Sequence, residues 1–160
     1  MRGLSWKISR DGERSVVQLK GSIDETAGFV DLVDELGATR TIRLDLGGVQ
    51  RINSSGVREW ITFIRKLPPG SPVELERCTP VLVSQLNVIN RFAGDARVLS
   101  VYAPFVCPHC KHEENVLLDV GAGRSKLSLG SVKCSSCRKP SEFDDVEDAY
   151  FAFLDPDAER

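Results

Sequence analysis

Two short cysteine pairs place the strongest restriction on how this chain can fold. Cys107 and Cys110 form one C-x-x-C turn, Cys134 and Cys137 form a second, and 23 residues separate the two turns. Two such turns can present four sulfurs to one metal ion at the corners of a tetrahedron, with Zn–S bonds of about 2.3 Å. The spacing therefore predicts one structural zinc ion per chain, bound by these four thiolates.

The segment that carries the cysteines has little core of its own and resembles a zinc ribbon. Metal binding should supply roughly 10 kcal/mol or more of the apparent folding free energy of so small a unit. His109 and His112 flank the first pair. Four cysteines complete a tetrahedron without them, so we interpret both histidines as neighbours of the site and not as ligands.

A redox reading of the first pair is the alternative. The turn Cys107-Pro108-His109-Cys110 also resembles the active-site turn of thioredoxin-fold disulfide oxidoreductases, where the first thiolate is activated at a helix N-terminus. Too few residues follow Cys110 for such a domain, and the second pair would have no role. A thiol-disulfide oxidoreductase using Cys107 is therefore the weaker hypothesis, and we predict a protein without catalytic residues. Cys78 is expected to be a small buried apolar residue.

The first hundred residues read as an α/β domain. Strand patterns fall near residues 4–8, 17–19, 41–46, 73–75 and 98–102, and helical patterns over 25–37, from 55 to about 67, and from 80 to about 93. This order predicts a mixed sheet with helices packed on it, in a domain over residues 1–104. Residues 105–160 would form the cysteine module and a terminal helix over 144–154. That helix needs a cover for one apolar stripe: Val146, Ala149, Tyr150, Phe153 and Leu154.

Charge and hydropathy narrow the range of partners. The chain has 21 basic and 23 acidic residues, and residues 107–160 are more acidic still, with seven basic against eleven acidic side chains. This balance argues against binding to nucleic acid. The N-terminus lacks the apolar core of a signal peptide, and no stretch reaches the roughly 20 apolar residues that cross a bilayer. We expect a cytoplasmic protein, off the membrane, with protein partners.

A serine-containing turn carries the second motif. The run from Asp45 to Gly56 resembles the STAS domain of bacterial anti-sigma factor antagonists, whose pattern is approximately D-L-S-x-V-x-x-I-D-S-S-G-L. The matching positions are Asp45, Leu46, Val49, Ile52, Ser54, Ser55 and Gly56. Gly21-Ser22-Ile23-Asp24 is similar to the family's G-x-L-D, and the resemblance covers residues 4–103. It implies a STAS-like fold and a non-enzymatic role in bacterial signalling.

The resemblance also implies a switch site. A partner anti-sigma factor with serine kinase activity would phosphorylate Ser54, or alternatively Ser55, in a pocket that includes Asp24, Asn53, Ser55 and Gly56. A phosphate at a helix start would meet unsatisfied backbone N–H groups and the positive end of the helix dipole. Its charge of about −1.5 to −2 could expel a bound partner.

Two departures from the family pattern support a different role. Asn53 replaces the usual aspartate, and Arg58, Glu59 and Trp60 are expected to add charge and bulk to the docking surface. In this alternative, Ser54 and Ser55 only cap a helix, and the chain is a constitutive scaffold or assembly subunit. A second copy of the chain, in a homodimer, is a further candidate partner.

Overall fold

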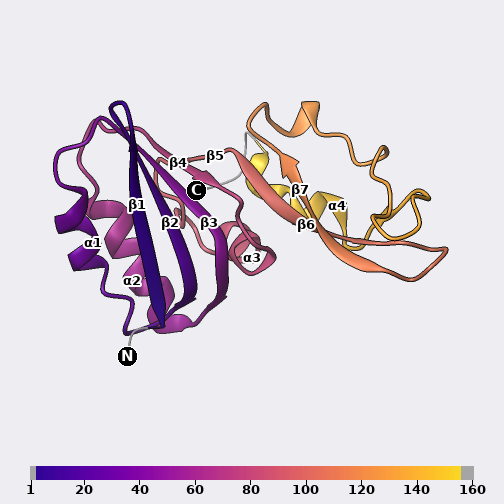
Figure 1. Ribbon diagram of the computed structural model, residues 1–160, viewed down its shortest axis with the longest axis horizontal. Helices are drawn as coiled ribbons and strands as arrows, with labels where there is room; N and C mark the ends of the chain where they lie inside the picture. Colours follow the sequence, from indigo (N-terminus) through magenta and orange to yellow (C-terminus); the bar gives the residue numbers. More distant parts are fainter. Residues whose placement is uncertain (1–2, 156–160) are drawn as a thin grey trace.

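The computed structural model describes residues 3–155 and contains two sheets (Figure 1). The larger sheet has the strand order β1-β2-β3-β4-β5, in which β1 and β2 are antiparallel and the later neighbours are parallel. This mixed sheet confirms the expected α/β architecture. Its strands are β1 (Leu4–Asp11), β2 (Arg14–Ile23), β3 (Thr41–Ile52), β4 (Val73–Glu76) and β5 (Arg97–Val98).

The helices of this half are α1 (Phe29–Leu36), α2 (Ser54–Lys66) and α3 (Pro80–Val88). Figure 1 shows α1 and α2 together on one face of the sheet. An aromatic cluster fills the space beneath them: the rings of Phe29 and Phe63 stack at 4.5 Å and those of Trp60 and Phe92 at 5.6 Å. Each such side chain stabilises the fold by roughly 1.5–3 kcal/mol when buried.

Strand β3 is longer than the sequence pattern indicated. Gly47 and Gly48 were expected to end it, but it continues to Ile52. The reason is a close approach to β2, since a Cβ on Gly48 would lie 2.8 Å from the Leu19 carbonyl oxygen. The pairing with β2 shifts register here and then resumes. The extra length carries the chain to Asn53, beside the end of β2.

The smaller sheet has the order β7-β6-β8 and is built from β6 (Ser100–Val106), β7 (Glu113–Asp119) and β8 (Glu142–Phe143). The strand expected over 98–102 is divided between the two sheets, with Leu99 at the change. The Leu99 N–H donates to the Leu75 carbonyl at 2.8 Å, and the Tyr102 N–H donates to the Cys78 carbonyl at 2.8 Å. The sheets are therefore joined by hydrogen bonds as well as by the chain. That 1–104 and 105–160 are separate domains stays a prediction.

Two partly buried polar contacts support this junction. Arg77 donates to the Asp45 carboxylate at 2.9 Å and to the Tyr102 hydroxyl at 3.1 Å, so one guanidinium links β3 to β6.

Cys78 is 1% exposed, as expected for a small apolar residue. Burial raises the pKa of its thiol to about 12.

The C-terminal helix is shorter than predicted. The expected helix over 144–154 is a single turn, α4 (Glu147–Tyr150), followed by the 3-10 turn η2 (Ala152–Leu154). The expected apolar stripe is wrong at Val146, which is 66% exposed, and at Ala149, which is exposed as well. It also missed Phe151, which is fully buried. A change to 3-10 geometry turns Phe151 inward, against Phe143.

The cover for this segment comes from the same chain. Asn87 on α3 donates to the Tyr150 carbonyl at 2.9 Å and accepts from the Phe153 N–H at 2.9 Å. The Tyr150 hydroxyl donates to the Tyr102 carbonyl at 2.5 Å. Tyr150 and Phe153 are both buried, which confirms that this segment packs within the chain.

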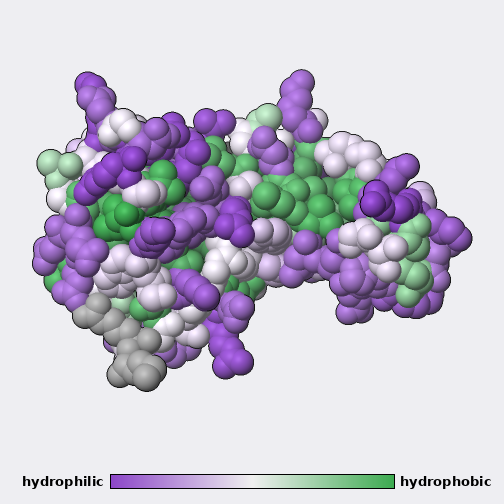
Figure 2. All heavy atoms as spheres, viewed as in Figure 1, coloured by the Kyte–Doolittle hydropathy of each residue, from purple (hydrophilic) through white to green (hydrophobic). Residues whose placement is uncertain are grey.

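The remaining surface is mostly polar. Figure 2 shows hydrophilic side chains over much of one face, with hydrophobic areas between them, one of them over the second sheet. Leu117 on β7 is 48% exposed. None of the helices described within residues 3–155 combines the length and the apolar character that a bilayer crossing requires.

A pair of substitutions tests the terminal packing. Phe151→Ala should lower the free energy of unfolding by about 3–5 kcal/mol, because it removes a fully buried ring. Val146→Ala should change it by less than about 0.5 kcal/mol, because the side chain is exposed. Urea unfolding of both variants measures the difference. Equal, small effects would contradict the observed packing.

Candidate functional site: a serine turn and a four-cysteine centre

Ser54 and Ser55 are the first two residues of α2, directly after β3. Both side chains are exposed. Neither hydroxyl makes a hydrogen bond to another residue within the described part of the chain. The two hydroxyls are therefore accessible from solvent, and neither makes a hydrogen bond that stabilises the described fold.

The cap of α2 is Asn53. Its Oδ1 accepts a hydrogen bond from the Gly56 N–H at 2.7 Å, and its carbonyl accepts the first helical bond, from Val57, at 2.9 Å. The capping role expected for Ser54 and Ser55 is therefore wrong. Asparagine is among the most favourable N-cap residues, and the serines, one and two positions later, lie inside the helix.

Gly56 fixes how α2 sits on the sheet. A Cβ at this position would lie 1.9 Å from the Ile23 carbonyl oxygen at the end of β2, so no larger residue fits without a backbone shift. The Asn53 N–H donates to the same oxygen at 3.2 Å. The helix start is thus held directly against the strand end.

An acidic loop borders the turn. Asp24 Oδ1 accepts from the hydroxyl of Thr26 at 2.5 Å and from its backbone N–H at 2.8 Å, and these two bonds lower the pKa of the Asp24 carboxyl. The Thr26 hydroxyl in turn accepts from the Gly3 N–H at 3.1 Å. The carboxylate of Asp24 is therefore engaged with its own loop.

Glu25 belongs to this site although the sequence did not indicate it. Its Oε2 accepts a hydrogen bond from the Asn53 side-chain amide at 3.2 Å. The structure thus brings Asn53, Gly56 and the loop 24–26 together at the start of α2. No sequence pattern pairs residues 25 and 53, because the contact depends on where β2 and β3 end.

The outer surface of α2 is charged but not bulky. Arg58 and Glu59 are exposed as expected. Trp60 is fully buried and donates from its indole N–H to the Phe92 carbonyl at 2.8 Å, so the expectation that it enlarges the docking surface is wrong. Arg58 follows Ser54 by four residues, which places both on one side of the helix.

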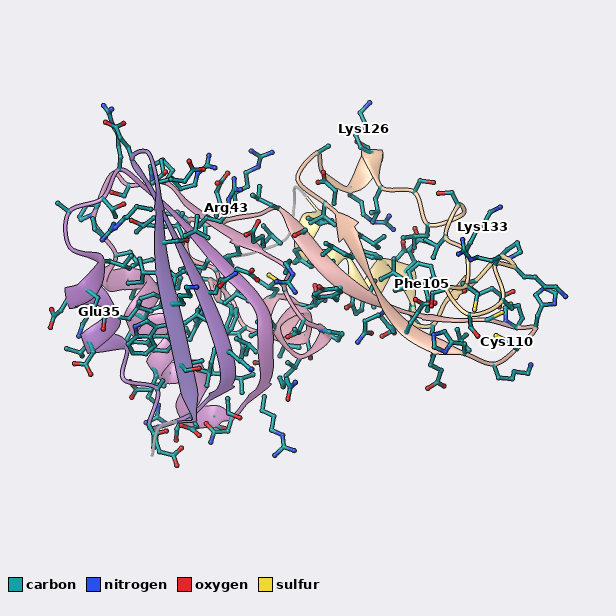
Figure 3. All side chains as sticks on the ribbon, viewed as in Figure 1. Glu35, Arg43, Phe105, Cys110, Lys126 and Lys133 are labelled. Atoms are coloured by element: carbon teal, nitrogen blue, oxygen red, sulfur yellow. The ribbon has the colours of Figure 1, made fainter. Side chains whose placement is uncertain are left out.

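The four predicted cysteine ligands form one cluster at the far end of the β6–β7 hairpin, where Figure 3 labels Cys110. Their sulfurs all lie within 4.8 Å of one another. Cys107 Sγ is 3.5 Å from Cys137 Sγ, and Cys110 Sγ is 3.6 Å from Cys134 Sγ. Sulfurs around a tetrahedral ion with 2.3 Å bonds are about 3.8 Å apart, so the geometry can bind a metal ion. None of the five cysteines forms a disulfide.

The two cysteine turns repeat one backbone arrangement. In the first, the Lys111 N–H donates to the Cys107 carbonyl and the Cys107 N–H to the His112 carbonyl, both at 2.9 Å. In the second, the Arg138 N–H donates to the Cys134 carbonyl at 2.9 Å and the Cys134 N–H to the Lys139 carbonyl at 2.8 Å. Lys111 and Arg138 both have positive φ, at 67° and 68°. Each turn therefore presents its two sulfurs in the same way.

The two histidines lie outside the cluster of sulfurs. His109 is exposed, and the His112 ring lies 3.3 Å from Ser135 Oγ and 3.7 Å from the Glu114 carboxylate. Glu114 also accepts from the Ser135 N–H at 2.9 Å, which ties the second cysteine turn to β7.

The environment of Cys107 favours a thiolate. The backbone N–H of Cys110 points to Cys107 Sγ at 3.5 Å and is the main cause that lowers the pKa of this thiol to about 6. Cys107 is buried, and a turn into β7 follows it where a redox motif of the thioredoxin type has a helix. A metal ligand suits this position better than an attacking thiolate.

Comparison with known proteins finds partial likenesses to solved structures, among them the following two. The chain is similar to the crystal structure of an anti-sigma factor antagonist from Mycobacterium paratuberculosis, at 16% identity and a TM-score of 0.45, over 53% of this chain and 76% of that one. It is also similar to a crystal structure of a protein called Mglu, at 31% identity and a TM-score of 0.38, over 43% of this chain and 18% of that one. No family model and no curated protein matches the sequence.

A likeness at this identity and TM-score does not assign a function, so the case for one rests on the residues of the chain itself.

The identity of the α2 cap can be tested directly. Asn53→Ala should lower the free energy of unfolding by about 1 kcal/mol, because the Gly56 N–H loses its acceptor. Ser54→Ala should change it by less than about 0.5 kcal/mol, because its hydroxyl has no partner in the described structure. Chemical denaturation compares the two variants. A larger loss for Ser54→Ala would show that the serine is the cap.

Proposed function

We propose that this chain is a non-enzymatic, anti-sigma factor antagonist-like protein-binding switch of bacterial signalling, controlled by phosphorylation of Ser54. The observation that carries the proposal is that Asn53, and neither serine, caps α2. Asn53 caps the helix, so the two exposed serine hydroxyls have no capping duty to explain their presence. This argues against the alternative in which Ser54 and Ser55 only cap the helix.

A phosphate on Ser54 would change the surface in a defined way. It would add about −1.5 to −2 charges at the first turn of α2, where the N–H groups of Ser54 and Ser55 have no helical acceptor. Asp24 and Glu25 lie on the loop beside this turn, so the edge would become strongly negative. A partner seated there would meet charge repulsion and a larger side chain.

The partner class follows from the same chemistry. A protein that reads the turn and also phosphorylates it, such as an anti-sigma factor with serine kinase activity, fits a switch of this kind, and Ser55 is the alternative acceptor. The location would be the cytoplasm. A constitutive scaffold is the competing function, and it predicts that the state of Ser54 has no effect on binding.

The cysteine cluster is proposed to bind one structural zinc ion per chain. Four thiolates at the observed separations fill a tetrahedron and leave no open position for a substrate. Zinc would hold together two turns that the short second sheet alone fixes weakly. The ion would stabilise the fold and take no part in a reaction.

Metal analysis tests the zinc proposal. Protein prepared without chelator should contain about one equivalent of zinc, released by acid or by a strong chelator because the thiolate ligands are protonated or outcompeted. Cys134→Ser should lose the metal, whereas Cys78→Ser should keep it, because Cys78 lies outside the cluster. Less than about half an equivalent in the unmodified protein would count against a closed four-thiolate site.

Variants of Ser54 test the switch. Ser54→Asp should weaken capture of the natural partner from native extract by about tenfold or more, because charge is added to the acidic edge, whereas Ser54→Ala should bind as the unmodified chain does. Quantitative mass spectrometry of the captured proteins compares the variants. If Ser54→Asp and Ser54→Ala retain the same proteins at equal levels, the scaffold function is the correct one.

A further inference from the structure

Asn53 uses both ends of its side-chain amide. Oδ1 accepts from the Gly56 N–H at 2.7 Å and caps α2, while Nδ2 donates to Glu25 Oε2 at 3.2 Å. One planar group therefore connects the helix start to the loop that follows β2. An amide can do both, whereas a carboxylate cannot, since the cap needs an acceptor and the glutamate carboxylate needs a donor.

This double role explains why asparagine stands where the STAS pattern has aspartate. An aspartate at position 53 could still cap α2, but it would place a second carboxylate about 3 Å from Glu25, and like charges at that distance repel. With Asn53, the negative charge beside Ser54 is provided by Glu25. The two residues form a matched pair.

We propose that the Asn53–Glu25 hydrogen bond is a latch that phosphate on Ser54 opens, freeing residues 24–26 from the start of α2. The inference rests on the proposed function and adds its regulation. Ser54 directly follows Asn53, so the phosphate would lie close to the Glu25 carboxylate and repel it. Arg58, exposed and without an ion-pair partner in the described structure, lies one turn along on the side of Ser54 and would attract the phosphate away from the loop.

The released loop would transmit the phosphorylation of Ser54 to a partner protein. Residues 24–26 are held by short local bonds, from Thr26 to Asp24 and from Gly3 to Thr26, and Glu25 is their side-chain link to α2. Opening this link exposes a different edge to a partner than the closed state does. The partner would then sense loop position as well as the phosphate.

The experiment uses the full chain with phosphoserine incorporated at position 54 during synthesis. The Asn53 side-chain amide resonances should shift, and hydrogen exchange of residues 24–26 should become about threefold faster or more than in the unmodified chain. Unchanged resonances and exchange would overturn the latch. Because the phosphate is installed directly and no partner is present, this result is independent of whether a kinase modifies Ser54 in the cell.

Glu25→Gln supplies the matched control. Glutamine can still accept the bond from Asn53 but carries no charge, so phosphoserine should leave its loop exchange unchanged. Faster exchange in this variant equal to that in the unmodified chain would overturn the charge mechanism. Without phosphate, Asn53→Asp should raise the unfolding constant about two- to fivefold, and Glu25→Gln in the same chain should reverse most of that rise.

Discussion

The contact of α2 with the end of β2 is the constraint on which the serine turn depends. With no side chain at Gly56, the first turn of the helix lies against the Ile23 carbonyl, and Asn53 closes the same junction from its backbone and its side chain. The helix start is therefore rigid without help from Ser54 or Ser55. A turn that displays two free hydroxyls beside a carboxylate suits reversible modification, because charge added there leaves the Asn53 cap and the contact of Gly56 with β2 in place.

The second half of the chain differs from the first in how it is stabilised. Its sheet has three strands, of which β8 is only two residues long, so its own apolar core is small. Two features compensate for this small core. The terminal segment docks on α3 and β6 through Asn87 and Tyr150, and the four cysteines are gathered for a metal ion at the outer end. The core is continuous across both halves, which connects the stability of the cysteine module to that of the first sheet.

Local patterns determined what could be predicted from the sequence. The cysteine spacing fixed the four candidate ligands, and Gly37 ends α1 as expected, its N–H bonded to the Val33 carbonyl. Predictions that depended on packing between distant segments were wrong. Gly48 allows β3 to pass close to β2 where a break was expected, and Phe151 turns inward in place of Val146 because a 3-10 turn follows α4. The Glu25–Asn53 pair could not be predicted, since it forms only where two strands end side by side.

We propose that the serine turn is a site of modification and not only the start of a helix. Phosphopeptide mass spectrometry of the protein purified from its native cell, under conditions in which its signal varies, tests this claim most directly. The account predicts phosphate on the peptide containing Ser54, at an occupancy that changes with the signal. A peptide that is fully covered and never phosphorylated on Ser54 or Ser55, under any condition that alters partner binding, would contradict it.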